Sequence, residues 1–127
     1  MNRLLLALGT LLVTLMLAAC SSATAGQPSG PTATPGPNDV TIAAKDMQFV
    51  QRDITVTAGA AFTILFDNQE GAPHNVSLYD ASGTSISKGE IFSGPAQRAQ
   101  QVPALAAGAY TYKCDLHPDM TGTLTAK

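Results

Sequence analysis

Hydrophobic and polar side chains alternate along much of residues 39–127, a pattern typical of strands that bury one face. The clearest example is the segment 61–68, where Phe62, Ile64 and Phe66 fall on the same side. The same period of two residues occurs in four other segments: 53–59, 74–80, 109–114 and 121–127. No segment sustains the 3.6-residue period of a helix, so an all-β domain is predicted.

Turn-forming residues separate these predicted strands. Gly, Pro, Asn, Asp and Ser cluster at four places: 58–59, 68–73, 82–83 and 94–95. Many short strands punctuated in this way are typical of a sandwich of two sheets. We therefore predict a Greek-key β-sandwich of seven or eight strands over residues 39–127.

The N-terminus has a different pattern. Arg3 precedes an apolar run over residues 4–19 that ends in small side chains, which is typical of an export signal. The run is shorter than the roughly 20 residues that span a bilayer. Its last residues, LAAC, resemble the lipobox of bacterial lipoproteins, in which the chain is cut before a lipid-bearing cysteine. We predict a signal peptide at 1–19 and lipidation of Cys20; ordinary secretion and an uncleaved anchor are the alternatives.

A linker separates this signal from the predicted domain. Residues 20–38 are rich in Pro, Gly, Ser and Thr and carry no large apolar side chain, so they cannot form a core. The whole chain is 45% hydrophobic and 13% charged, which is typical of a globular protein. Its net charge of −2, with no basic cluster, argues against nucleic acid as a partner.

Metal-binding side chains gather near the C-terminus. Cys114, His117 and Met120 follow one another in a C-x2-H-x2-M spacing between two predicted strands. The chain has two cysteines and two histidines, and lipidation of Cys20 would leave Cys114 as the only thiol. The other histidine, His74, begins a predicted strand and can reach the same end of a sandwich. Two His, one Cys and a weak axial Met form the ligand set of blue-copper sites.

Each of these residues also has a purely structural explanation. A buried lone cysteine is usually an inert part of the core, and a single His or Met is usually structural. Their tight spacing favours a metal site. Two alternatives stay open: a Cys-His₂ zinc site with an open position, and a nucleophilic Cys114 with His117 as its base. Asp115 and Asp119 are expected to cap the loop or face solvent rather than bind metal.

Residues 39–127 resemble the cupredoxins, the family of plastocyanin-like and amicyanin-like blue copper proteins. The resemblance is carried by the segment 68–76, which contains PHNV, and by the segment 108–122, GAYTYKCDLHPDMTG. It implies one type 1 copper ion with four ligands: His74, Cys114, His117 and Met120. It also implies that Asn75 forms hydrogen bonds that fasten the two ligand loops together.

The resemblance further implies a function in electron transfer rather than catalysis. His117 would be the electron port, within a small apolar patch that redox partner proteins contact transiently. Candidates for this patch are Ala72, Pro73, Leu116 and Pro118. Together with the predicted anchor, this describes an electron carrier tethered to a bacterial membrane, on its periplasmic or cell-surface side. A copper carrier or buffer is the alternative, but there is no Met-rich or His-rich tract to favour it.

Overall fold

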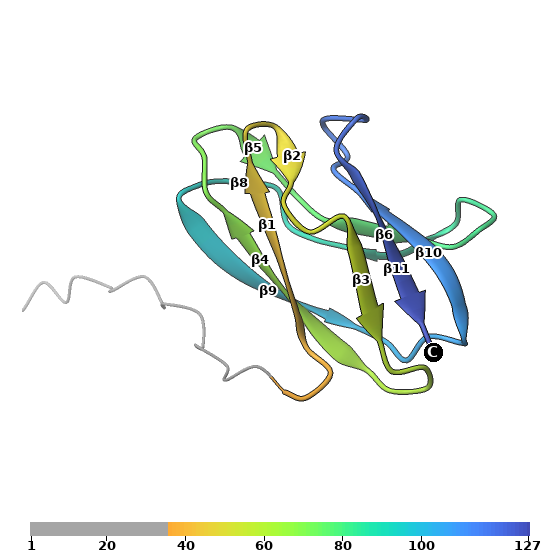
Figure 1. Cartoon of the computed structure of the whole chain (residues 1–127). Coiled ribbons are helices and arrows are strands. Elements are labelled where there is room, and N and C mark those ends of the chain that lie inside the picture. The colour runs from red at the N-terminus through yellow and green to blue at the C-terminus, as the bar shows by residue number, and fades with distance from the viewer. Residues whose placement is uncertain (1–35) are drawn as a thin grey trace, which may run out of the picture.

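The computed structural model describes residues 36–127 and shows a sandwich built entirely of strands and loops (Figure 1). The predicted signal peptide 1–19, the lipidation site Cys20 and most of the predicted linker 20–38 lie outside the described residues. The strands are β1 (Val40–Lys45), β2 (Gln48–Phe49), β3 (Asp53–Val56), β4 (Phe62–Asn68), β5 (Pro73–His74), β6 (Ser77–Tyr79), β7 (Ser85–Lys88), β8 (Phe92–Ser93), β9 (Ala96–Val102), β10 (Gly108–Lys113) and β11 (Thr121–Ala126).

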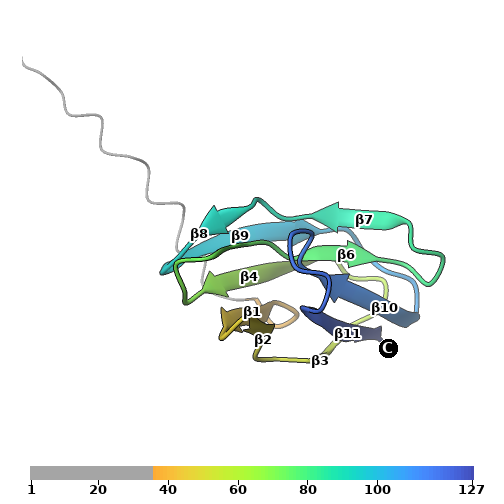
Figure 2. The same cartoon turned by 90° about the horizontal axis from the view of Figure 1, so that it is seen from above.

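Two mixed sheets form the layers of the sandwich. One has the strand order β2-β1-β4-β9, and the other has the order β3-β11-β10-β6-β7. Figure 2 shows the four-stranded sheet on one side and the five-stranded sheet on the other. The β1–β4 and β3–β11 pairs are parallel, and the other pairs are antiparallel. The prediction of an all-β sandwich is confirmed.

The number of strands is larger than predicted. The described residues form eleven strands rather than seven or eight, although only eight of them are three residues or longer. The short strands β2, β5 and β8 are two residues each. A period of two cannot be recognised in two residues. These strands also depend on tertiary packing, which places each of them beside another segment of the chain.

The core follows the predicted alternation where one face of a strand is apolar. In β4, Phe62, Ile64 and Phe66 are buried, as predicted, and the residues between them are partly exposed. Across the core, the rings of Phe49 from one sheet and Tyr112 from the other lie 5.4 Å apart between centroids. Aromatic contacts of this kind stabilise the packing of the two sheets against each other.

The strand β9 was not predicted from the sequence. Its residues, AQRAQQV, are mostly polar and exposed, so they show no hydrophobic alternation. The strand exists because it pairs along its whole length with β4, from Ala96 opposite Asn68 to Val102 opposite Phe62. Backbone pairing can therefore define a strand whose side chains carry no signal of it.

The β10–β11 hairpin, which carries the candidate metal-binding loop, depends on a glycine. Gly122 lies opposite Tyr112 in the register, and a Cβ added at Gly122 would overlap the Tyr112 ring and hydroxyl. The ring cannot move aside easily, because Tyr112 is fully buried and its hydroxyl donates to the carbonyl of Gln51. Beta-sheet packing at this point has no room for a side chain.

We expect Gly122→Ala to lower the free energy of unfolding by about 1–3 kcal/mol, the usual cost of overpacking a core. Urea unfolding of the metal-free protein measures this change. Gly71→Ala is the matched control, because no atom lies within 4 Å of a Cβ at that position. The control should shift stability by less than about 0.5 kcal/mol. Equal unfolding midpoints for the two variants would contradict the clash.

No helix in residues 36–127 has the length and apolar character needed to cross a membrane.

Candidate metal centre

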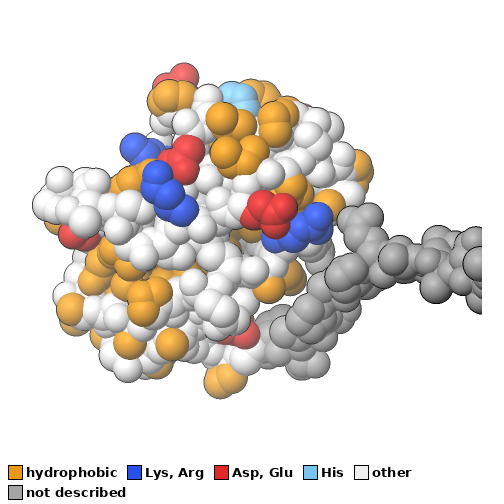
Figure 3. Space-filling view, turned by 180° about the vertical axis from the view of Figure 1, so that it is seen from behind, with side chains coloured by type: hydrophobic (Ala, Val, Ile, Leu, Met, Phe, Trp, Pro, Cys, Tyr) orange, Lys and Arg blue, Asp and Glu red, His pale blue; other side chains and the backbone are white. Residues whose placement is uncertain are grey.

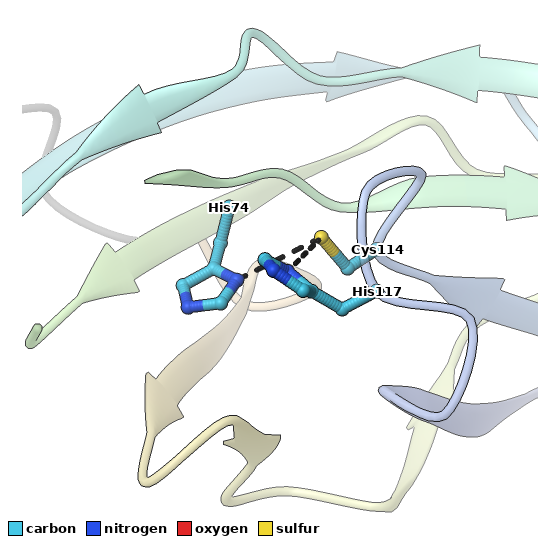
Figure 4. A group of neighbouring side chains, drawn as sticks. All are labelled: His74, Cys114 and His117. Carbon is cyan, nitrogen blue, oxygen red and sulfur yellow. Dashed lines mark hydrogen bonds between the residues drawn. The ribbon is translucent and has the colours of Figure 1, made fainter. Parts of the chain in front are cut away.

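Three potential metal ligands converge at the end of the sandwich where β5 lies and where β10 turns into β11 (Figures 1 and 4). The Nδ1 atom of His74 lies 3.7 Å from the Sγ atom of Cys114, and the Nδ1 atom of His117 lies 3.5 Å from it. The centroids of the two imidazole rings are 4.7 Å apart. Folding thus brings His74 beside Cys114, although 40 positions separate them in sequence.

The loop between β10 and β11 is closed by its own backbone. The N–H of Cys114 donates to the carbonyl of Met120 at 3.0 Å, and the N–H of Met120 donates to the carbonyl of His117 at 2.9 Å. These bonds hold all three residues of the C-x2-H-x2-M spacing in one compact turn. The spacing therefore matches the length of a single closed loop between two paired strands.

The geometry of the cluster fits one metal ion. With metal–sulfur bonds of about 2.3 Å and metal–nitrogen bonds of about 2.0–2.1 Å, donors at tetrahedral to trigonal angles lie about 3.6–3.8 Å apart. The observed sulfur–nitrogen separations of 3.5 and 3.7 Å are close to this range. A thiol has one proton and can donate to one imidazole at a time, yet both imidazole nitrogens face the sulfur. One thiolate and two imidazoles suit soft or borderline metals.

Burial differs among the candidate ligands. His74 is 0% exposed and Cys114 and Met120 are each 1% exposed, whereas His117 is only partly buried. Met120 and Cys114 belong to the same cluster of core side chains, so the predicted axial ligand lies in the core beside the loop. His117 is therefore the candidate ligand through which the site meets the surface.

Apolar residues near His74 and His117 in the sequence are wholly or partly exposed. Leu116 is 45% exposed, Pro73 and Pro118 are exposed, and Ala72 is partly exposed. These are the four residues suggested from the sequence for an apolar patch. Figure 3 shows hydrophobic side chains bordering a histidine at the surface of the molecule. Few charged side chains interrupt that border in this view.

Asn75 connects the two segments that carry the candidate ligands. Its Oδ1 accepts the backbone N–H of Asp115 at 2.9 Å, and its Nδ2 donates to Oδ2 of Asp115 at 3.0 Å and to the carbonyl of Gly89 at 3.2 Å. Since Asn75 directly follows His74 and Asp115 directly follows Cys114, these bonds tie the two ligand segments together.

Asp115 is exposed, as is Asp119, and its carboxylate also fastens the loop through hydrogen bonds. Besides its bonds to Asn75, its carboxylate accepts the hydroxyls of Ser77 and Tyr79, each at 2.6 Å. Burial raises the pKa of Asp115, but these hydrogen bonds outweigh that effect and lower the pKa to about 2. The same bond to Asp115 raises the pKa of the Tyr79 phenol.

The hydrogen bonds of Asp115 explain why the alternation in segment 74–80 does not separate a buried face from an exposed one. The pattern set Asn75 and Ser77 on a polar face opposite Val76 and Leu78, yet all four residues are buried. The ligand loop covers the polar side and supplies hydrogen-bond partners through Asp115. Buried polar groups are tolerated when they are paired in this way.

Glu70 is a residue of the site that the sequence analysis did not select. Its Oε1 lies 2.8 Å from the Nε2 atom of His74. In Figure 4 it is the other ring nitrogen of His74, Nδ1, that is directed toward Cys114. Oε1 of Glu70 also accepts the backbone N–H of Met47 at 3.1 Å. The sequence signal that could have identified Glu70 is its position four residues before His74. In an irregular loop, however, that spacing does not imply that the two side chains are in contact.

A β-sandwich with a buried cysteine and two histidines at one end is an arrangement that could hold a metal ion. Residues 8–126 match the family model of the cupredoxin-like domain, and the chain belongs to this family. The resemblance noted in the sequence is thereby confirmed at the level of the family. A search of curated proteins found no match.

Solved structures with the same fold include auracyanins and amicyanin. Amicyanin from Paracoccus versutus is 27% identical, with a TM-score of 0.58 over 75% of this chain and 86% of that one. Auracyanin A, described as a "blue" copper protein from Chloroflexus aurantiacus, is 23% identical, with a TM-score of 0.64 over 72% and 100%. Reduced auracyanin from Roseiflexus castenholzii is 17% identical, with a TM-score of 0.64 over 71% and 97%. The two auracyanins demonstrate likeness of fold alone.

Proposed function

We propose that this protein is a type 1 copper protein that passes single electrons between redox partners. The convergence of His74, Cys114 and His117 on one buried point is the observation that carries the proposal. Met120 completes the ligand set as the weak axial donor. Membership of the cupredoxin-like family and the fold shared with a "blue" copper protein support the choice of copper.

The residues around the site suit repeated electron transfer. When bound, copper supplies a one-electron couple whose two states prefer different ligand geometries. Cys114 and His117 sit in a loop closed by backbone hydrogen bonds, and Asn75 ties that loop to the segment carrying His74. Ligands held this firmly change position little between the two states, which lowers the reorganisation needed for each transfer.

His117 is the proposed route for electrons to and from the surface. It is the one partly exposed side chain among the four proposed ligands, and the exposed Leu116 and Pro118 flank it in sequence. A small apolar surface of this kind suits short encounters, since weak redox complexes typically bury less than about 1,200 Å² in total. The proposed partners are redox proteins that dock there transiently.

We also propose that Cys20 bears a lipid and anchors the domain to a bacterial membrane outside the cytoplasm. The supporting observation is the LAAC sequence that ends the apolar N-terminal run. Signal peptide 1–19, linker 20–38 and cupredoxin domain 39–127 are the corresponding parts of the chain. Mass spectrometry of the mature N-terminal peptide tests both cleavage and lipidation; an unmodified Cys20 would contradict the anchor.

A copper carrier would use the same ligands, so it is the second candidate. Within residues 36–127 the methionines are Met47 and Met120, and they form no Met-rich tract that could relay Cu(I). An enzyme is disfavoured because a second copper centre needs further histidines, and the chain has two. Fast electron exchange with redox proteins supports the electron carrier; slow exchange with prompt copper release to an acceptor supports the copper carrier.

The first test is the visible absorption spectrum of the purified protein after addition of Cu(II). An intense blue or green band from thiolate-to-copper charge transfer is expected. A colourless protein that binds Zn(II) or Cu(I) tightly would overturn the proposal in favour of the zinc or carrier alternative.

Met120→Leu is expected to raise the reduction potential of the copper-loaded protein. Leucine fills the buried space of Met120, 1% exposed, but removes the thioether that donates to Cu(II). Protein-film voltammetry measures the shift. The matched control is Met47→Leu, because Met47 is 44% exposed and lies outside the proposed ligand set. An unchanged or lower potential in Met120→Leu would argue against axial ligation.

A further inference from the structure

We propose that Glu70 is a positioning residue for His74 and that its negative charge favours the oxidised form of the bound metal. The carboxylate holds the proton of His74 on Nε2, which leaves Nδ1 free to face the metal beside Cys114. This inference rests on the proposed copper site, and it assigns a role to a residue outside the four proposed ligands.

The two nitrogens of His74 have different partners. Nδ1 faces the Cys114 sulfur at 3.7 Å, and Nε2 lies 2.8 Å from Oε1 of Glu70. An ionised carboxylate accepts hydrogen bonds and cannot donate them, so the contact requires a proton on Nε2. In a neutral imidazole the other nitrogen then carries the lone pair that binds metal. Because His74 is fully buried, its Nε2 atom is covered by protein, and Glu70 is the hydrogen-bond partner that the structure gives it.

Glu70 is itself held by three separate parts of the chain. Its Oε1 also accepts the N–H of Met47 at 3.1 Å, from a turn in which Met47 has a φ of 59°. Its own N–H donates to Oδ1 of Asn68 at 3.1 Å, and its carbonyl accepts the N–H of Gly94 at 2.9 Å. Contacts that orient a ligand histidine in this way typically change metal affinity by about 10–100-fold when they are removed.

The charge of Glu70 acts on the site without a basic counter-charge. Among the described residues, the other ion pair joins Arg98 to Glu90, and no Lys or Arg pairs with Glu70. Its side chain is 23% exposed, so solvent screens it only in part. Oxidation adds one positive charge to the metal, and a nearby carboxylate stabilises the more positive state. Glu70 should therefore lower the reduction potential.

Three variants separate these roles. Glu70→Gln keeps an oxygen acceptor for His74 and Met47 but removes the charge, whereas Glu70→Ala removes both. Glu90→Gln is the matched control, because it makes the same chemical change at the other glutamate of the chain, which is 67% exposed. Circular dichroism establishes that each variant is folded.

The first measurement uses the metal-free protein. Nitrogen-15 NMR of the His74 ring, under conditions where the imidazole is neutral, reports which nitrogen carries the proton. The parent protein, Glu70→Gln and Glu90→Gln should hold it on Nε2, and Glu70→Ala should show a mixture of tautomers. Retention of a single Nε2–H tautomer in Glu70→Ala would overturn the positioning role.

The second measurement uses the copper-loaded protein. Glu70→Gln should weaken binding of Cu(II) relative to Cu(I) by about tenfold, which for a one-electron couple raises the potential by about 59 mV. Glu90→Gln should leave the potential near that of the parent. A Glu70→Gln potential equal to that of Glu90→Gln would overturn the electrostatic role, and this test remains available if Glu70→Ala fails to fold.

The two measurements also separate this inference from the proposed function. If the parent protein binds no copper, the copper proposal fails, while the tautomer of metal-free His74 still decides the positioning role. If the parent is blue and neither variant of Glu70 changes tautomer or potential, the inference fails and the proposed function stands.

Discussion

Replacing Cys114 by serine is expected to abolish the intense visible band of the Cu(II)-loaded protein while the sandwich remains folded. The band requires a thiolate bound to Cu(II), and Cys114 is the free cysteine of the described residues. Serine is close in size to cysteine, and its hydroxyl can occupy the same 1% exposed position. Visible absorption and circular dichroism measure the two parts of this prediction.

The control for Cys114→Ser is Cys20→Ser, which removes the other thiol of the chain. That variant should keep the band unchanged, because Cys20 precedes the described domain. A Cys114→Ser protein that is still blue with Cu(II) would rule out the thiolate ligand. Loss of colour together with loss of the β-sheet circular dichroism would show instead that Cys114 is needed for folding.

Replacing Asn68 by alanine is expected to destabilise the metal-free protein by about 3 kcal/mol or more. The Asn68 side chain is fully buried at the end of β4. Its Nδ2 donates to the carbonyls of Ala72 at 2.9 Å and Phe92 at 2.8 Å, and its Oδ1 accepts the N–H of Glu70 at 3.1 Å. Each hydrogen bond contributes about 0.5–1.5 kcal/mol, and each buried group left unpaired costs about 1–3 kcal/mol.

Urea unfolding of the metal-free protein measures the effect, with Gln69→Ala as the matched control. Gln69 is the exposed neighbour of Asn68, and its side chain bonds only to Asp67 among the described residues. The control should change stability by less than about 0.5 kcal/mol. Similar losses in both variants would contradict the role of Asn68. Because this loop carries Glu70 and His74, Asn68→Ala should also weaken copper binding.

Part of the fold and of the metal site could be predicted from the sequence, because those features produce patterns among residues close together in the chain. The alternation in β4 identified Phe62, Ile64 and Phe66 as core residues, since a strand with one buried face must place apolar side chains at every second position. The proximity of Cys114 and His117 could be predicted without knowing the fold, because both residues lie in one short loop. The partnership of Cys114 with His74 was suggested by the position of His74 at the start of a predicted strand and by the family resemblance, but neither gives the distance between them.

Other features depended on neighbours that are distant in sequence. The strand β9 has polar side chains and is defined by its pairing with β4. Asn75 and Ser77 are buried because the loop carrying Asp115 lies over them, although their polarity indicated a solvent-facing side. The contact of Glu70 with His74 depends on the turn at Met47, which belongs to another part of the chain.

The sequence by itself determined the class of fold, the apolar face of β4 and the grouping of Cys114, His117 and Met120. Periodicity and short spacing suffice for these features, because each depends on bonds and burial within a few residues. Only the tertiary structure decided the eleven-strand arrangement, the approach of His74 to Cys114 and the hydrogen bonds of Asn75 and Glu70. Those contacts join segments whose relative positions are fixed by how the two sheets and their loops pack, and no local pattern encodes that packing.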